Sequence, residues 1–323
     1  MNKIAVITGA GGVLCGVIAA DLAARGYKTA LLDINGDAAK RLAEDFRKKG
    51  FEANAYAADV LNKADLERAR ERIEADFGAC DLLVNGAGGN NPSATTDEEF
   101  YGGIFMSEDT SLASARADGK EAVSAYSDKN ESKTDSHSAG AYKDGNKTVF
   151  LGSNVNGNKK KSFFDLTEKG VDFVFDLNFK GTFLATQVFA ECMAERGGGN
   201  IINISSMNAF TPLTKIPAYS AAKAAVSNFT EWLAVYFAGA GVRVNALAPG
   251  FFITNQNRTL LFQADGAPTE RAKKILSGTP MKRFGEPGEL LGAVRFLSDD
   301  GASGFVTGVV LPIDGGFNAY SGV

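Results

Sequence analysis

The chain has 323 residues, of which 45% are hydrophobic and 22% are charged, as in an ordinary globular protein. Its net charge of −4 offers no basic surface for nucleic acid, and no apolar run is long enough for a membrane helix. The one histidine, His137, lies in a polar stretch, which argues against a histidine base, a zinc dehydrogenase and a Ser-His-Asp hydrolase.

The first predicted element is a buried strand at residues 3–7, which leads into a glycine-rich turn and then a helix at 12–25. Such a strand, turn and helix present backbone N–H groups to a pyrophosphate. A glycine run alone could also be a plain loop. The dinucleotide contacts predicted from this segment are Thr8, Gly9, Gly11, Gly12, Val13 and Leu14.

The second predicted strand, 28–32, ends directly before Asp33. An acidic residue at this distance from the glycine turn meets the ribose 2′-hydroxyl of a dinucleotide. Its carboxylate would repel a 2′-phosphate, so the sequence favours NAD over NADP. The alternative is that Asp33 is a helix N-cap or turn residue before Gly36.

Strands and helices go on alternating up to residue 84, with helices at 37–49 and 63–77 and strands at 53–57 and 81–84. This alternation predicts an α/β fold, a doubly wound, Rossmann-like parallel sheet of about seven strands. Two strand ends add further predicted cofactor contacts, namely Asp59, Val60, Asn85, Gly86, Ala87 and Gly88.

The alternation stops at Asn91-Pro92, and residues 95–161 are polar with few apolar positions. A loop of that length inside a compact domain is uncommon, and it is usually a lid, an appended subdomain or disordered chain. We therefore expect one domain over 1–323, with 95–161 as an insertion that is either a lid or disordered.

Regular structure is predicted to resume after the insertion. The expected elements are helices at 171–195, 218–237 and 290–297 and strands at 200–204, 242–247 and 309–313. Pro312 predicts an edge position for the last strand. The turns after residues 84, 204 and 248 follow successive strands of a parallel sheet, so they should line one crevice.

Tyr219 and Lys223 lie four residues apart on a predicted helix and therefore share a face. There the ammonium would lower the pKa of the phenol from about 10 towards neutrality, so that it could donate or accept a proton. Such a pair is common on helices, but Asn178 and Ser206 upstream make a catalytic constellation the better interpretation.

Cys15, Cys80 and Cys192 are odd in number and widely spaced, so we expect neither a disulfide framework nor a metal site. The first strand begins at once, which leaves no room for a signal peptide. Both observations favour a cytoplasmic protein.

Outside the insertion, the chain resembles the short-chain dehydrogenase/reductase family. The resemblance rests on Asn85-Gly86-Ala87-Gly88, Tyr219-x-x-x-Lys223 and the C-terminal Asp314-Gly315-Gly316. It implies that Asn178, Ser206, Tyr219 and Lys223 are catalytic, that Lys223 also holds the cofactor ribose, and that the cofactor is NAD. It further implies cofactor contacts from Pro249, Gly250, Phe252 and Thr254. One departure is that Val13 and Cys15 stand at the second and third glycine positions of the family's turn.

Within the family, the chain resembles the D-mannonate oxidoreductase (fructuronate reductase) branch through Gly-Gly-Val-Leu-Cys, the Ser206-Met207-Asn208 segment and the chain's last residues. This implies a sugar-acid substrate such as D-mannonate or D-fructuronate. Another polyol or keto acid, or a catalytically idle nucleotide-binding protein, remain alternatives. The residues predicted to contact substrate are Asn90, Asn208, Lys215, Asn257 and Arg258.

The two long predicted helices carry more apolar positions than one sheet face needs, among them Phe189, Phe229, Trp232, Leu233 and Tyr236. In the family that the chain resembles, these helices pack across two-fold axes. We therefore expect a homodimer or homotetramer.

Overall fold

The computed structural model describes residues 3–100, 141–144, 147–150, 160–254 and 257–322. The chain divides into two compact units, a main unit of Met1–Thr95 with Thr167–Val323 and a second unit of Thr96–Leu166. Among the described residues, no helix is both long enough and apolar enough to cross a membrane.

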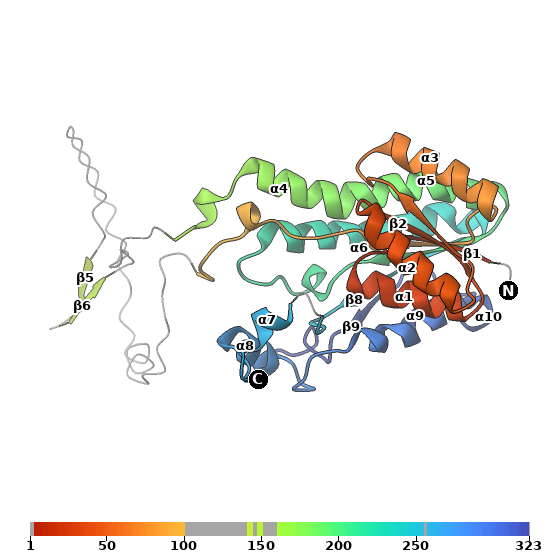
Figure 1. Cartoon of the computed structure of the whole chain (residues 1–323). Coiled ribbons are helices and arrows are strands. Elements are labelled where there is room, and N and C mark those ends of the chain that lie inside the picture. Colours follow the sequence, from red (N-terminus) through yellow and green to blue (C-terminus); the bar gives the residue numbers. More distant parts are fainter. Residues whose placement is uncertain (1–2, 101–140, 145–146, 151–159, 255–256, 323) are drawn as a thin grey trace, which may run out of the picture. The chain divides into compact units, whose positions relative to one another are not determined.

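A parallel sheet forms the centre of the main unit (Figure 1). It has seven strands in the order β3-β2-β1-β4-β7-β8-β9. The strands are β1 (Ile4–Thr8), β2 (Lys28–Asp33), β3 (Ala53–Ala57), β4 (Leu82–Asn85), β7 (Gly199–Ile204), β8 (Val242–Pro249) and β9 (Val310–Ile313). The chain order reverses between β1 and β4, which opens a crevice at the carboxyl ends of these strands. The predicted doubly wound fold is confirmed, and Pro312 lies on an edge strand as predicted.

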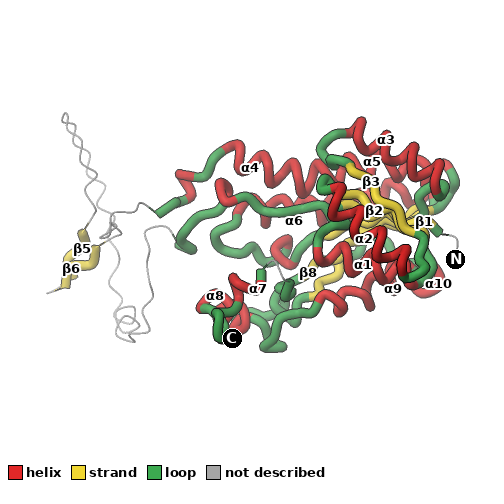
Figure 2. The backbone as a smooth tube through the Cα atoms, in the orientation of Figure 1, coloured by secondary structure: helices red, strands yellow, loops and turns green. Residues whose placement is uncertain are grey.

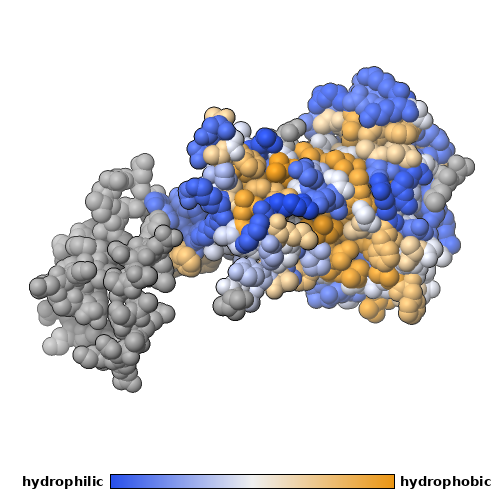
Figure 3. Space-filling model, turned by 90° about the horizontal axis from the view of Figure 1, so that it is seen from below, coloured by the Kyte–Doolittle hydropathy of each residue, from blue (hydrophilic) through white to orange (hydrophobic). Residues whose placement is uncertain are grey.

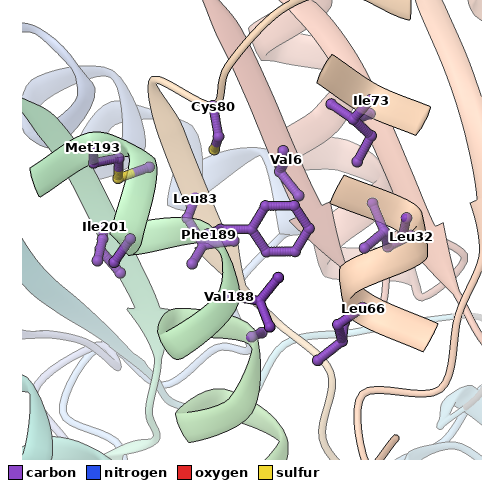
Figure 4. Close-up of a cluster of buried hydrophobic side chains, with 14 of the residues drawn as sticks. Val6, Leu32, Leu66, Ile73, Cys80, Leu83, Val188, Phe189, Met193 and Ile201 are labelled. Carbon is purple, nitrogen blue, oxygen red and sulfur yellow. The ribbon is translucent and has the colours of Figure 1, made fainter. Parts of the chain in front are cut away.

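Helices cover both faces of this sheet (Figure 2). One face packs against α3 (Lys63–Asp76), α5 (Gly181–Glu195) and α6 (Pro217–Phe237), and the other against α1 (Val13–Ala24), α2 (Gly36–Lys48) and α9 (Leu291–Ser298). Alternation along β1 serves both cores, because Val6 belongs to the first cluster while Ala5 and Ile7 belong to the second. In Figure 4, the ring of Phe189 lies in the middle of the first cluster.

The remaining helices of the main unit are short. They are α4 (Glu168–Phe175), α7 (Arg258–Leu261), α8 (Glu270–Gly278) and α10 (Asp300–Ser303). The helix predicted at 171–195 begins earlier, at Glu168, and a π-helical turn at Asp176–Lys180 separates α4 from α5. This turn was not predicted, and it carries Asn178.

Within the second unit, β5 (Ala141–Asp144) and β6 (Lys147–Phe150) form an antiparallel pair that was not predicted. The polar insertion after the fourth strand is confirmed as part of the fold. Most of the insertion, and with it the choice between lid and disorder, lies outside the described residues.

Some large hydrophobic side chains reach the surface of the main unit. Figure 3 shows hydrophobic areas between hydrophilic margins on the face that it views. On α6, Trp232 is 55% exposed, Val235 81% and Tyr236 65%. Phe189 and Leu233, which were also counted as surplus apolar residues, are buried in the core instead.

Candidate functional site

Two turns meet at the carboxyl ends of β1 and β4. The strands pair in register, with Thr8 opposite Asn85. The Thr8 Oγ1 accepts hydrogen bonds from the backbone N–H groups of Gly86 (3.0 Å) and Ala87 (3.3 Å). The hydroxyl of β1 therefore holds the β4 turn against the glycine-rich turn.

The glycine-rich turn needs its first glycine. Gly9 has a φ of +66°, and a Cβ on it would lie 2.9 Å from the backbone nitrogen of Ala87. Helix α1 begins after Gly12, and no side chain among the described residues caps its N-terminus. The first N–H groups of α1 are therefore available to an anion such as a pyrophosphate.

Asp33 lies over this turn at the end of β2. Its Oδ2 accepts from the Gly11 N–H at 2.9 Å, and its Oδ1 accepts from the Asn35 N–H at 2.8 Å. The N-cap of α2 is Asn35, whose side chain accepts from the Ala38 N–H. The alternative of Asp33 as a helix N-cap is therefore wrong, whereas its bond to the Asn35 N–H confirms the alternative of a turn residue before Gly36. Each carboxylate oxygen can accept a further hydrogen bond, for example from a ribose hydroxyl.

Asp59 and Val60 follow β3, which pairs with β2. The Asp59 Oδ1 accepts from the Leu61 N–H at 2.9 Å, which fixes the turn. Val60 is 7% exposed and packs closely on Gly181. A Cβ on Gly181 would lie 2.8 Å from the Val60 Cγ2. The turn after β3 is thus fastened to the start of α5.

Tyr219, Lys223 and Ser206 come together where α6 meets the end of β7. The Ser206 hydroxyl lies close enough to Tyr219 to lower the pKa of its phenol, and the Lys223 Nζ lies 5.7 Å from the centre of the tyrosine ring. The same Nζ donates to the Ile204 carbonyl oxygen at 2.8 Å. The neighbouring Ser205 is used differently, since its Oγ donates to the Lys223 carbonyl oxygen at 3.1 Å. The geometry therefore distinguishes the two serines, and Ser206 is the one beside the tyrosine.

Asn178 is fully buried on the π-helical turn. Its Nδ2 donates to the carbonyl oxygens of Gly89 (2.7 Å) and Val174 (2.8 Å), and its Oδ1 accepts from the Gly89 N–H (3.2 Å). A Cβ on Gly88 would lie 2.7 Å from the Asn178 Oδ1 and 3.2 Å from the Lys223 Nζ. Asn178 thus ties the turn after β4 to the helix, and Gly88 allows the lysine to approach it.

Burial controls the ionisation of this cluster. It lowers the pKa of Lys223 to about 8, because the ammonium loses its hydration. It also raises the pKa of Tyr219, and the hydrogen bond from Ser206 offsets this only in part. The expectation that Lys223 brings the tyrosine pKa towards neutrality is wrong for this structure, because desolvation dominates. Tyr219 is therefore protonated near neutral pH, as a proton donor must be.

The segment after β8 is fixed on both sides. The Gly250 N–H donates to the Ile313 carbonyl oxygen at 2.9 Å, and a Cβ on Gly250 would lie 2.6 Å from that of Asp314. Phe252 is 6% exposed, and the Thr254 Oγ1 accepts from the Asn257 N–H at 3.3 Å. Pro249 is the last residue of β8, so the whole segment begins at the carboxyl edge of the sheet.

The five predicted substrate contacts differ in burial and in hydrogen bonding. Asn208, two residues after Ser206, is 5% exposed, and its Oδ1 has no hydrogen-bond partner among the described residues. Asn257 is engaged at both ends, since its Oδ1 accepts from the Thr254 N–H and its Nδ2 donates to the Phe252 carbonyl oxygen, each at 2.8 Å. Asn257 therefore shapes the loop.

The other three lie on separate segments, namely the loop after β4, the residues before α6 and the first residue of α7. Asn90 is exposed, and its Nδ2 donates to the Thr95 Oγ1 at 3.0 Å. Lys215 has a φ of 72°, the left-handed region that few side chains adopt, just before α6. Arg258 is exposed at the start of α7, with its guanidinium 5.5 Å from the Phe262 ring centre.

A buried network of side-chain hydrogen bonds was not predicted from the sequence. The Asn85 Nδ2 donates to the Thr186 Oγ1 (2.9 Å) and the Asn203 Oδ1 (2.8 Å), and the Asn203 Nδ2 donates to the Thr230 Oγ1 (2.9 Å). These bonds join β4 and β7 to α5 and α6. An asparagine inside an apolar strand, at Asn203, was the available signal.

Comparison with known proteins places this site in context. A family model described as short chain dehydrogenase matches residues 3–102, and one described as Enoyl-(Acyl carrier protein) reductase matches residues 111–318. An uncharacterized oxidoreductase of Haemophilus influenzae is 50% identical over 322 residues, covering 100% of this chain and 95% of its own. The Bacillus subtilis oxidoreductase UxuB, also uncharacterized, is 45% identical over 322 residues, covering 100% and 97%.

One solved structure is similar over the whole chain. It is described as a candidate D-mannonate oxidoreductase from Haemophilus influenzae with bound NAD. It is 49% identical, with a TM-score of 0.81, and the match covers 100% of this chain and 97% of that one.

Proposed function

The chain belongs to the short-chain dehydrogenase/reductase family, and from that premise we propose that it uses NAD(H) to interconvert a sugar acid and its keto form. The observation that carries this proposal is the cluster of Ser206, Tyr219 and Lys223 beside the crevice between β1 and β4. The sugar acid proposed is D-mannonate, with D-fructuronate as the keto form, because the similar solved structure is described as a candidate D-mannonate oxidoreductase.

The residues of the crevice fit a dinucleotide. The turn from Thr8 to Leu14 would hold the pyrophosphate, because α1 offers uncapped N–H groups and Gly9 leaves no side chain in the way. Asp33 would hold the adenosine ribose, and Lys223 the nicotinamide ribose. Bound NAD(H) supplies or accepts the hydride.

In the reducing direction, the Tyr219 hydroxyl donates its proton to the carbonyl oxygen as the carbonyl carbon is reduced, and the product is the alcohol. Ser206 donates a hydrogen bond to the same oxygen and stabilises its developing charge. Lys223 stabilises the phenolate that remains. Oxidation runs through the same groups in reverse.

Asn178 organises these groups. Its amide holds Gly89, and Gly88 leaves room for the Lys223 ammonium. The family resemblance adds a water that relays protons to the lysine, and we retain that role for Asn178 as a prediction.

A sugar acid also needs groups that hold its carboxylate and hydroxyls. Lys215 and Arg258 supply positive charge on the loops before α6 and at the start of α7. Asn208 supplies a buried acceptor for a substrate hydroxyl, because its Oδ1 is unpartnered. Asn90 completes the proposed set, whereas Asn257 acts by positioning the loop.

The second candidate is a dehydrogenase for another polyol or keto acid, since the catalytic cluster itself does not select the substrate. A panel of keto acids and ketoses assayed by NADH absorbance separates the candidates. We expect D-fructuronate to give a kcat/KM at least about tenfold above every other compound, a difference of roughly 1.4 kcal/mol. A better substrate among the other keto acids or the ketoses would favour the second candidate instead. No turnover of any compound, with NADH bound, would favour the idle nucleotide-binding protein.

A further inference from the structure

The thiol of Cys15 fills a space in the fold that exists because residue 86 is a glycine. Cys15 is the third residue of α1 and is 5% exposed. A Cβ built on Gly86 would overlap the Cys15 Sγ, whereas it would lie 3.6 Å from the Cys15 Cβ, an ordinary contact. Within Cys15, the obstruction therefore comes from the sulfur and not from the Cβ.

The turn has no room to avoid that sulfur. On another side, the Cβ at position 86 would lie 3.0 Å from the Thr8 carbonyl oxygen. The Gly86 N–H is bonded to the Thr8 Oγ1, and a Cβ on Gly9 would already press on Ala87. Larger side chains at 15 and 86 together would thus force the glycine-rich turn and the turn after β4 apart.

The same sulfur lies near the catalytic cluster. Cys15 and Lys223 are close enough to influence each other's pKa, and the Asp33 carboxylate also raises the pKa of Cys15. Burial raises the pKa of the Cys15 thiol to about 12, so the group is a neutral spacer near pH 7. Cys15 thus lies in the first turn of α1, next to the proposed pyrophosphate turn, with its sulfur against Gly86 in the turn after β4.

We propose that Cys15 and Gly86 are a complementary pair that sets the separation of these two turns and thereby positions the cofactor against Lys223. Cys15 stands at the third glycine position of the family's turn, and Gly86 supplies the space that its side chain requires. Cys15 is in this sense a positioning residue. The inference rests on the proposed function only in so far as the crevice holds NAD(H).

A double-mutant cycle tests the pair. Its two readouts are the melting temperature of the cofactor-free protein and the affinity for NADH. Gly86→Ala should lower the melting temperature and weaken NADH binding at least about tenfold, measured by nicotinamide fluorescence well below unfolding. Cys15→Ala should weaken NADH binding about threefold to tenfold, less than Gly86→Ala does, because loss of the sulfur leaves a cavity between the two turns.

The double variant Cys15→Ala/Gly86→Ala should recover NADH affinity to within about threefold of the parent, because the new methyl occupies the space of the sulfur. Cys15→Ser/Gly86→Ala should not recover, since an oxygen stands where the sulfur did. Gly16→Ala is the matched control on the same helix, because its Cβ would make only ordinary contacts, 3.4 Å from the Ala10 carbonyl oxygen and 3.8 Å from the Leu42 Cδ2.

Parent-like NADH binding by Gly86→Ala, or purely additive effects in the Cys15→Ala/Gly86→Ala variant, would overturn the inference. If the parent binds no NADH, the proposed function fails instead, and the cycle in melting temperature still decides whether the two residues are paired. Where Gly86→Ala does not fold, recovery of folded protein in the Cys15→Ala background, but not in the Cys15→Ser background, decides the same question.

Discussion

At the scale of a single residue, the buried Lys223 ammonium destabilises the fold but is required by the proposed function. Lys223 is 4% exposed, its ammonium donates a hydrogen bond to the Ile204 carbonyl oxygen, and burial lowers its pKa to about 8. The fold therefore pays a desolvation cost for a group that the proposed chemistry needs charged. An apolar side chain at this position would give a more stable fold.

Lys223→Met should abolish turnover and weaken NADH binding, yet leave the protein as stable as the parent or more stable at pH 7. The folded pKa of about 8 lies below that of an unfolded lysine, so the parent carries the full penalty below pH 8. The penalty is up to about 3 kcal/mol, is offset by about 1 kcal/mol for the hydrogen bond, and fades as the pH rises towards about 10. Urea unfolding at pH 7 and 10 measures this. An advantage of the variant that grows with pH would contradict the account.

Asp33 is predicted to select NAD over NADP. Asp33→Ala should narrow the preference by at least about tenfold, chiefly through the KM for NADP, because the carboxylate that repels a 2′-phosphate is removed. The variant also loses the bonds to Gly11 and Asn35, so its melting temperature serves as the control. A parent enzyme that already prefers NADPH would show that this interpretation of β2 is wrong.

At the scale of elements, the alternation of strands and helices predicted the sheet. Short apolar runs that end at a glycine or an aspartate are typical of the buried strands of a parallel sheet. The π-helical turn was not predictable, because its cause is tertiary: Asn178 must reach Gly89 while Gly181 packs on Val60. The hairpin of β5 and β6 was missed because its residues carry little apolar pattern. The raised pKa of Tyr219 was missed because burial at the site cannot be deduced from spacing alone.

Gly88→Ala tests how closely the turn after β4 approaches α6 and the π-helical turn. The added methyl would lie 2.7 Å from the Asn178 Oδ1 and 3.2 Å from the Lys223 Nζ, so one of them must move. We expect kcat to fall at least about tenfold, with circular dichroism unchanged. Gly292→Ala on α9, where a Cβ meets nothing within 4 Å, is the matched control. Equal activity of the two variants would show that catalysis does not depend on the absence of a side chain at Gly88.

At the scale of the whole molecule, the exposed aromatic residues of α6 predict self-association. Trp232 stacks on Tyr236 with ring centres 4.9 Å apart, and Phe229 stacks on Trp232 at 6.2 Å, so the residues form a preorganised apolar surface. We expect light scattering to give a dimer or tetramer of the 34.0 kDa chain at micromolar concentration. Trp232→Glu/Tyr236→Glu should shift it to the monomer without loss of secondary structure, and a parent that is monomeric would refute the prediction.

The central claim is that Tyr219 exchanges a proton with the substrate in a cleft that binds NAD(H). Its most direct test compares the parent with Tyr219→Phe for both turnover and NADH affinity. Only the reacting oxygen is removed, so we predict that kcat for D-fructuronate falls at least about 10³-fold while the Kd for NADH stays within about threefold. Turnover within a few-fold of the parent would contradict the account.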